Sequence, residues 1–199
     1  MRRVALAATV LALLGAGLAC GGGESGPGVV TVLVERPGTV PERATGFVAG
    51  GSRVVTVAHV LDGGGAVAVH RPGGGALPAR VVRVDRAADL ALLDAGGAPA
   101  SAPPGGSEVR VLSAHDEGVR ALPVSVRRRI VARVRDSAGP QVYARPALEL
   151  AGEISGGDSG APVVDGGGRL LGVVFARSRR QPGTAYAVDA AAVHRLLGR

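Results

Sequence analysis

Short apolar runs alternate along this chain with clusters of glycine and proline. Runs such as Val54–Val57 are rich in β-branched valine and short enough to be single strands. Glycine clusters such as Gly63–Gly65 and Gly166–Gly168 supply turns between the runs. The pattern predicts an all-β sandwich or barrel. The strands are expected at Val29–Val34, Gly46–Ala49, Val54–Val57, Ala66–Val69, Ala79–Val84, Leu90–Leu93, Val109–Leu112, Ala121–Val134, Gln141–Ala144, Ala147–Leu150, Ala161–Val164, Leu170–Phe175 and Thr184–Val188.

Three segments depart from single short strands. Ala121–Val134 is too long for one strand, so two strands or a bend are expected there. Ala95–Ser107 is rich in glycine, proline and alanine and can connect two halves of the protein. At the end of the chain, Asp189 can cap a helix through Ala190–Ala192, and Val193–Leu197 places apolar residues on one face. We therefore expect many strands followed by one C-terminal helix.

The composition is globular, with 46% hydrophobic and 20% charged residues. The formal net charge is +7, and all 23 basic residues are arginine. Excess arginine can indicate a nucleic-acid partner, but these arginines are dispersed apart from Arg127–Arg129 and Arg179–Arg180. Aromatic residues, which stack on bases, are only 2% of the chain. A GC-rich genome explains the joint excess of Arg, Gly, Ala, Val and Pro better, so no nucleic-acid partner is expected.

The N-terminus has the features of an export signal. Arg2 and Arg3 precede the uncharged apolar run Val4–Ala19, which is short for a membrane-spanning helix. The run ends at Cys20, the only cysteine in the chain, and the small residues before it resemble a bacterial lipobox. The resemblance implies cleavage before Cys20 and lipidation of its thiol, which anchors the protein to the outer side of the cell membrane. The alternative is an ordinary signal with a stray cysteine, and a secreted or periplasmic protein.

The resulting domain organisation is simple. Residues 1–19 are expected to be a signal peptide, and residues 20–28, rich in glycine, a flexible tether. Residues 29–199 are expected to form one domain. With a single cysteine, the exported fold is stable without a disulfide in the chain.

Three residues carry candidate chemistry. Ser159 lies in Gly156-Gly157-Asp158-Ser159-Gly160, where glycines allow a tight turn that points backbone N–H groups inward. A polar turn is the alternative in so glycine-rich a chain. His59 follows an apolar strand and can act as a base facing a cleft. Asp89 directly precedes another apolar strand, where its carboxylate can orient an imidazole. Asp85 and Asp94 are competitors for that role, and His70, His115 and His194 are read as surface or core histidines.

The three residues occur in the order His, Asp, Ser, which is the order of chymotrypsin-like peptidases. Thr56-Val57-Ala58-His59 is similar to the Thr-Ala-Ala-His motif of trypsin-like peptidases, and Gly157-Asp158-Ser159-Gly160 matches their nucleophile motif. Asp89-Leu90-Ala91-Leu92-Leu93 resembles the motif of the bacterial HtrA-like branch. The similarity spans about residues 45–197. No PDZ domain follows in this sequence, so chaperone-protease behaviour is not carried over.

The resemblance implies two antiparallel six-stranded β-barrels with the site between them, followed by the C-terminal helix. It also implies the catalytic roles. Ser159 attacks the substrate carbonyl, His59 is general base and then acid, and Asp89 orients the imidazole. The backbone N–H groups of Gly157 and Ser159 form the oxyanion hole. The expected activity is serine endopeptidase hydrolysis of extracytoplasmic proteins, by a monomer without a cofactor or metal.

The sequence also raises the question of what two further acidic residues, Asp158 and Glu153, do. In digestive members of this family, the residue equivalent to Asp158 pairs with a newly liberated N-terminus, which a lipidated Cys20 would not supply. We expect an internal arginine from Arg127–Arg129 to pair with Asp158 instead. Glu153 lies near the start of the specificity pocket and either selects basic side chains or is a structural residue of the rim. Two other functions also stay open: a catalytically silent peptide-binding homologue, and an envelope scaffold.

Overall fold

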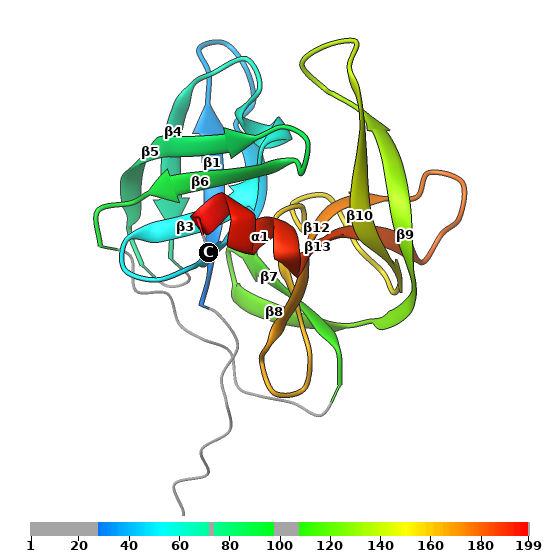
Figure 1. Ribbon diagram of the computed structural model, residues 1–199. Coiled ribbons are helices and arrows are strands. Elements are labelled where there is room, and N and C mark those ends of the chain that lie inside the picture. Colours follow the sequence, from blue (N-terminus) through cyan, green and yellow to red (C-terminus); the bar gives the residue numbers. More distant parts are fainter. Residues whose placement is uncertain (1–27, 72–73, 98–107, 199) are drawn as a thin grey trace, which may run out of the picture.

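The computed structural model describes residues 28–71, 74–97 and 108–198, which form two β units side by side (Figure 1). The first unit is a closed barrel of six antiparallel strands in the order β1-β2-β3-β6-β5-β4. Its elements are β1 (Val29–Glu35), β2 (Glu42–Val48), β3 (Arg53–Val57), the short 3-10 helix η1 (His59–Leu61), β4 (Ala66–His70), β5 (Ala76–Asp85) and β6 (Leu90–Asp94).

Valine fills the first barrel. Val54, Val55 and Val57 on β3 are fully buried and belong to the main hydrophobic cluster. On β1 the buried positions are nearly continuous rather than alternating. This strand pairs with β2 and β4 inside the barrel and also contacts β7 of the second unit, so both of its faces are covered. The continuous apolar run in the sequence is a consequence of burial on both faces.

The second unit is a seven-stranded antiparallel sheet in the order β8-β7-β11-β12-β13-β10-β9. Its edge strands, β8 and β9, are consecutive in the chain and are joined only by Val124. The sheet therefore curls until its two edges meet at that corner, without closing by hydrogen bonds as the first barrel does. The strands are β7 (Arg110–His115), β8 (Gly118–Pro123), β9 (Ser125–Arg135), β10 (Val142–Ala151), β11 (Pro162–Val164), β12 (Leu170–Arg177) and β13 (Thr184–Asp189).

The all-β class and the first six-stranded barrel are confirmed, whereas the second unit is a seven-stranded sheet where a second six-stranded barrel was expected. The long segment Ala121–Val134 does contain two strands. One local expectation was wrong: the separate strands expected at Gln141–Ala144 and Ala147–Leu150 are replaced by the single strand β10, which begins at Val142. Proline cannot donate a hydrogen bond to a sheet, yet Pro146 lies inside β10. It is tolerated since β13 pairs with β10 only from Ala147 onward, which leaves the other side of Pro146 at an open edge.

The C-terminal helix α1 (Ala190–Leu197) forms as expected. The Asp189 side chain accepts a hydrogen bond from the N–H of Ala191 at 3.0 Å, and Val193 and Leu196 are buried. The helix crosses the boundary between the two units (Figure 1) and contacts β5 and β6 of the first barrel as well as β12 and β13. Arg83 of β5 donates to the Leu196 carbonyl at 3.0 Å, a favourable position for a cation at a helix end. The helix thus ties the two units together.

The expected signal peptide, Cys20 and nearly all of the tether lie outside the described residues, as do residues 98–107 of the expected connection. Within the part of the chain that the structure describes, no helix has the length and apolar character needed to cross a membrane.

Candidate active site

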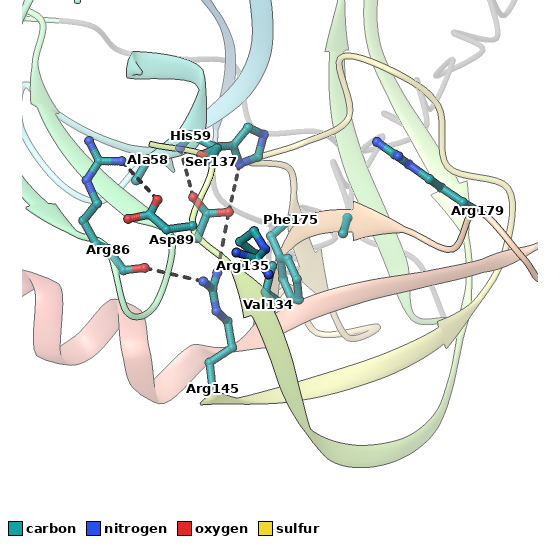
Figure 2. A pocket seen from close by; sticks show the side chains of 12 residues that line it. Ala58, His59, Arg86, Asp89, Val134, Arg135, Ser137, Arg145, Phe175 and Arg179 are labelled. Carbon is teal, nitrogen blue, oxygen red and sulfur yellow. Dashed lines mark hydrogen bonds and ion pairs between the residues drawn. The ribbon is translucent and has the colours of Figure 1, made fainter. Parts of the chain in front are cut away.

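His59 and Asp89 meet because the two strands that lead to them are neighbours. β3 pairs with β6, and Val57 lies opposite Leu90 at the end of the ladder. His59 comes two residues after Val57, and Asp89 comes directly before Leu90. The His59 Nδ1 atom lies 2.8 Å from Asp89 Oδ2, and the backbone N–H of His59 donates to Oδ1 at 2.9 Å (Figure 2). Both oxygens of the Asp89 carboxylate therefore hold the same histidine.

The turn before β6 presents the Asp89 carboxylate to His59. Asp89 has φ of 57°, the only positive φ of a non-glycine residue in the described ranges. Aspartate tolerates this left-handed conformation better than most residues. The turn is held by Asp89 N–H donating to the Arg86 carbonyl at 3.2 Å, and Ala58 N–H donating to the Asp89 carbonyl at 3.1 Å. The strained residue is thus supported on both sides by backbone hydrogen bonds.

The competing aspartates make other contacts. Asp85 accepts from the N–H of Ala88 at 2.9 Å, and Asp94 pairs with Arg80 at 3.3 Å at the far end of β6. Of the three candidates, only Asp89 hydrogen-bonds to His59.

The hydrogen bond sets the chemistry of the imidazole. An ionised carboxylate only accepts, so the Nδ1 atom of His59 donates and Nε2 is left free as a base. Burial lowers the pKa of His59, but the hydrogen bond and charge of Asp89, together with the charges of Asp62 and Glu42, outweigh burial and raise it. The His59 side chain is 34% exposed, so its Nε2 atom is accessible to a molecule bound beside it.

A buried arginine behind this pair was missed by the sequence reasoning. Arg145 of β10 is 4% exposed, and its Nη1 atom lies 3.6 Å from Asp89 Oδ2. Its guanidinium stacks over the Phe175 ring at 5.1 Å. The only signal in the sequence was a charged residue among the apolar positions of a strand, and so many arginines surround it that this signal was not specific.

The loop that carries Ser159 packs against the first barrel. Gly160 has φ of 86°, and a Cβ atom there would lie 2.0 Å from the Thr45 carbonyl oxygen, so only glycine fits. Thr45 of β2 donates its N–H to the Ser159 carbonyl at 2.8 Å and its hydroxyl to the Gly157 carbonyl at 3.0 Å. Thr45 itself is fully buried. The second unit's loop is thus fastened to a strand next to the one that leads to His59.

The backbone N–H groups around Ser159 are available. Among the described residues, neither the Gly157 N–H nor the Ser159 N–H has a hydrogen-bond acceptor. Both residues are partly exposed. No hydrogen bond joins the Ser159 hydroxyl to His59 in these ranges, and apo active sites often have such bonds long or poorly aligned. Free N–H groups at a glycine-rich turn are suitable donors for an oxyanion.

Asp158 is buried, 1% exposed, and is held by residues of its own unit. It accepts from the Ser113 hydroxyl and from the Ser155 N–H at 2.7 Å, and it lies 3.3 Å from His115 Nε2. Ser113 and His115 are both on β7. His115 therefore has a partner in the site region and is more than a surface histidine.

The expectation that Arg127–Arg129 would pair with Asp158 was wrong. Arg127 donates to Thr184 at 3.1 Å, Arg128 pairs with Glu149 at 2.9 Å, and Arg129 pairs with Asp189. The reason is topological: these arginines are on the edge strand β9, whereas Asp158 lies beside β7, nearer the other edge of the sheet.

A cavity of about 320 Å³ lies at the boundary of the two units. Figure 2 shows His59 and Asp89 entering it from the first barrel and Phe175, Arg145 and Arg179 from the second unit. Ser159 and its loop are not among the residues that line this cavity. In residues 28–71, 74–97 and 108–198, no group of three His, Cys, Asp or Glu side chains could hold a metal ion.

Glu153 lines a second cavity, of about 440 Å³. The cavity lies between the start of the Ser159 loop and the connection from β12 to β13, and Arg177 and Arg179 also line it. The neighbouring arginines supply positive charge to the same space. This placement is compatible with both roles expected for Glu153, selection of basic side chains and a structural role at the rim.

The two barrel-like units, with the His59–Asp89 pair and the Ser159 loop at their boundary, have the arrangement of a serine-type peptidase domain of chymotrypsin-like fold. The family model of the trypsin-like peptidase domain matches residues 44–173, a range that contains all three candidate residues. The chain therefore belongs to the trypsin-like peptidase family.

Relatives of known identity agree with this class. The chain is 33% identical over 158 residues to the serine protease Rv3671c of Mycobacterium tuberculosis, covering 75% of this chain and 40% of the relative. The chain thus spans less than half the length of that curated relative. The crystal structure of the Rv3671c protease in its active form superposes with a TM-score of 0.77 at 29% identity, over 87% of this chain and 81% of that one.

Two further structures bear on the fold. The inactive form of the Rv3671c protease gives a TM-score of 0.67, also at 29% identity, covering 87% of this chain and 89% of that one. An HtrA-type protease with a tripeptide gives 0.64 at 18% identity, over 88% of this chain and 60% of that one. At that identity the likeness concerns the fold alone.

Proposed function

We propose that this chain is a serine endopeptidase in which Ser159 is the nucleophile, His59 the general base and Asp89 the residue that orients it. The observation that carries the proposal is the Asp89 carboxylate holding His59 through both oxygens, in a barrel to which the Ser159 loop is fastened by Thr45. Family membership supports the same assignment.

In the first half of the reaction, the Ser159 hydroxyl oxygen attacks the carbonyl carbon of the scissile peptide bond. Its proton passes to Nε2 of His59, and Asp89 stabilises the resulting imidazolium. The carbonyl oxygen becomes an oxyanion, which accepts hydrogen bonds from the N–H groups of Gly157 and Ser159. The tetrahedral intermediate collapses as His59 returns the proton to the leaving amine, and an acyl ester on Ser159 remains.

In the second half, water replaces the departed amine. His59 takes a proton from that water, whose oxygen attacks the ester carbonyl. The second tetrahedral intermediate uses the same two N–H donors. It collapses as His59 returns the proton to the Ser159 oxygen, and the carboxylic acid product leaves. No metal or cofactor enters either half of this proposal.

A fluorophosphonate probe, which reacts with activated serines, tests the assignment. We expect the wild-type protein to be labelled, Ser159→Ala to be unlabelled and His59→Ala to be labelled weakly. Ser25→Ala is a control that should label like wild type. A correctly folded wild-type protein that takes up no probe would contradict the proposal and favour a silent homologue or a scaffold.

We propose further that the site needs no N-terminal cleavage. The partners of Asp158 come from Ser113, Ser155 and His115 inside the domain, so a liberated N-terminus is not required to hold the buried carboxylate in place. The higher TM-score to the active than to the inactive Rv3671c form supports a competent arrangement. A protein that stays inert until it is clipped before residue 29 would overturn this point.

The organisation outside the domain is also part of the proposal. Residues 1–19 are a signal peptide, residues 20–28 a tether, and residues 29–199 a monomeric domain held outside the membrane by lipid on Cys20. Substrates are then extracytoplasmic proteins or peptides. In a bacterial host, Cys20→Ser should abolish incorporation of a labelled fatty acid and move the protein out of the membrane fraction. Unchanged fractionation and labelling would contradict the lipid anchor.

A further inference from the structure

The structure places a buried cation directly behind the His59–Asp89 pair. Arg145 reaches from β10 of the second unit to Asp89 of the first barrel (Figure 2). Its Nη1 atom lies 3.6 Å from the same Oδ2 oxygen that accepts from His59 Nδ1 at 2.8 Å. One carboxylate oxygen is therefore shared between an imidazole in front and a guanidinium behind.

Little else in the site satisfies this guanidinium. Its Nη2 atom makes one long hydrogen bond, 3.5 Å, to the Arg86 carbonyl, and its buried Nε and Nη1 atoms have no hydrogen-bond partner among the described residues. The stack on Phe175 adds a cation–π contact on one face. A buried cation is unfavourable unless a counterion compensates it. Of the carboxylates in the described part of the chain, Asp89 is the one within ion-pair distance, so the energies of Arg145 and Asp89 are coupled.

The titration of Arg145 follows the same balance. Burial lowers the pKa of the Arg145 guanidinium, and the negative charges of Asp89, Asp85 and Asp136 offset part of that effect. Arginine stays protonated in proteins even when its pKa falls. The residue therefore supplies a permanent positive charge at a fixed place, in contrast to a hydroxyl or a water.

The cation has two consequences for Asp89. The His59 N–H groups hold the carboxylate from the first barrel, and Arg145 holds it from the second unit, so its rotation is restrained from both sides. The positive charge also offsets part of the negative charge that His59 senses through the shared oxygen. Other charged groups face His59 or line the cavity with it: Glu42, Asp62, Arg86, Arg135, Asp136 and Arg179.

We propose that Arg145 is a positioning residue for catalysis: its buried guanidinium fixes the Asp89 carboxylate across the boundary between the two units and tempers the charge felt by His59. This inference rests on the proposed roles of His59 and Asp89. Arg145 touches neither the substrate nor the reacting atoms, and acts through Asp89.

The direct test is the titration of His59 by NMR, in the Ser159→Ala background to prevent self-digestion. Replacing Arg145 by methionine keeps an unbranched apolar stem and removes the cation. We expect the pKa of His59 to rise in Arg145→Met, because Asp89 then directs its full charge at the imidazole. His70, His115 and His194 are internal references whose titration should not move. An unchanged His59 titration in folded Arg145→Met overturns the proposal.

Activity gives a second readout. In the Ser159-containing protein, Arg145→Met should lower kcat at neutral pH by roughly tenfold to hundredfold, as expected for a displaced catalytic group, with little change in KM. The acid limb of the kcat/KM profile should move to higher pH. Arg145→Lys, which keeps the charge without the planar fork, should restore part of kcat. A fall in folded protein alone, with the pH profile unchanged, would show that Arg145 is only structural and overturn the proposal.

The matched control is Arg128→Met, which removes a cation from an ion pair on the neighbouring strand. Arg128 pairs with Glu149 and its side chain is 69% exposed, so this variant should leave both the His59 titration and kcat unchanged. If Arg145→Met fails to fold, Arg145→Lys carries the test. In this variant, the pKa of His59 should stay near its wild-type value, but the Nδ1 proton of His59 should exchange with solvent faster. If both the exchange rate and kcat equal those of the wild type, the proposal is contradicted.

An error in the proposed peptidase function and an error in the role of Arg145 would give different experimental results. If the wild type neither labels with the fluorophosphonate probe nor cleaves peptides, the proposed function is wrong, yet the His59 titration still decides whether Arg145 is coupled to the pair. If the wild type cleaves peptides and Arg145→Met is indistinguishable from it, only the inference about Arg145 is wrong.

Discussion

The two halves of the candidate site are held in different ways. His59 and Asp89 belong to one barrel and meet because β3 and β6 are paired neighbours whose ladder ends beside them. Ser159 belongs to a loop of the other unit, and its position depends on Thr45, across the boundary, and on Ser113 of β7. The His59–Asp89 pair is formed within one closed barrel, whereas the position of Ser159 depends on how the two units pack together.

This difference predicts distinct ways for the site to fail. Substitutions at His59 or Asp89 in the first barrel should abolish catalytic activity while the Ser159 loop stays in place. Changes at the Thr45 contact or around Asp158 should disturb the loop while the His59–Asp89 hydrogen bond survives. Arg145 is the exception, because it connects the second unit to the His59–Asp89 pair.

The largest effect should come from Asp89→Asn. An amide cannot hold His59 in the required tautomer, so kcat should fall roughly 10⁴-fold, the magnitude typical of this change in such triads. Asp94→Asn, at the far end of β6, is the control and should keep near wild-type kcat. Rates measured on a chromogenic peptide, with circular dichroism to confirm folding, would decide. A loss of less than about tenfold would exclude Asp89 from the role.

The next largest effect should come from Gly160→Ala. The new Cβ would overlap the Thr45 carbonyl in a left-handed backbone conformation, which we expect to cost at least roughly 3 kcal/mol and to displace the loop. Probe labelling should be lost. Gly156→Ala, which meets no atom within 4 Å, should be labelled and remain stable. Equal labelling of the two variants would mean that the close approach at Gly160 is not needed.

A smaller effect is expected from Ser113→Ala. It leaves the buried Asp158 carboxylate without one of its donors, at a cost of about 1.5–3 kcal/mol in the free energy of unfolding. Labelling should slow while the titration of His59 stays the same. Urea unfolding monitored beside Ser125→Ala, an exposed serine on β9, provides the comparison. If Ser113→Ala matched Ser125→Ala in both stability and labelling, the Ser113 contact would have no role.

The mildest test changes only the pH. The pKa of His59 is raised, and the base must be neutral, so kcat/KM should climb with pH through a midpoint above the ordinary value of about 6.5. Below the midpoint the rate should fall about tenfold per pH unit. Stability changes in the opposite direction: the contribution of His59 is full below its unfolded pKa and is lost as pH rises through the folded pKa. A midpoint at or below about 6.5 would contradict this account.

Much of the fold was accessible from the order of residues alone. The strands of the first barrel, the two strands within residues 121–134 and the capped helix α1 follow from valine runs, glycine turns and a capping aspartate. These features act over a few residues, so local pattern is sufficient. The continuity of β10 through Pro146 was not predictable, because it depends on where β13 stops pairing.

The candidate triad residues were likewise identified by the sequence itself, since His59, Asp89 and Ser159 each lie in a short motif and occur in a recognisable order. Their supporting residues were decided only by the tertiary structure. Thr45, Ser113, His115 and Arg145 are ordinary residues of ordinary strands, and no local pattern distinguishes them. A polar side chain acquires such a role only when folding brings it, buried, against a distant carboxylate or carbonyl, and burial is what makes each of those contacts strong.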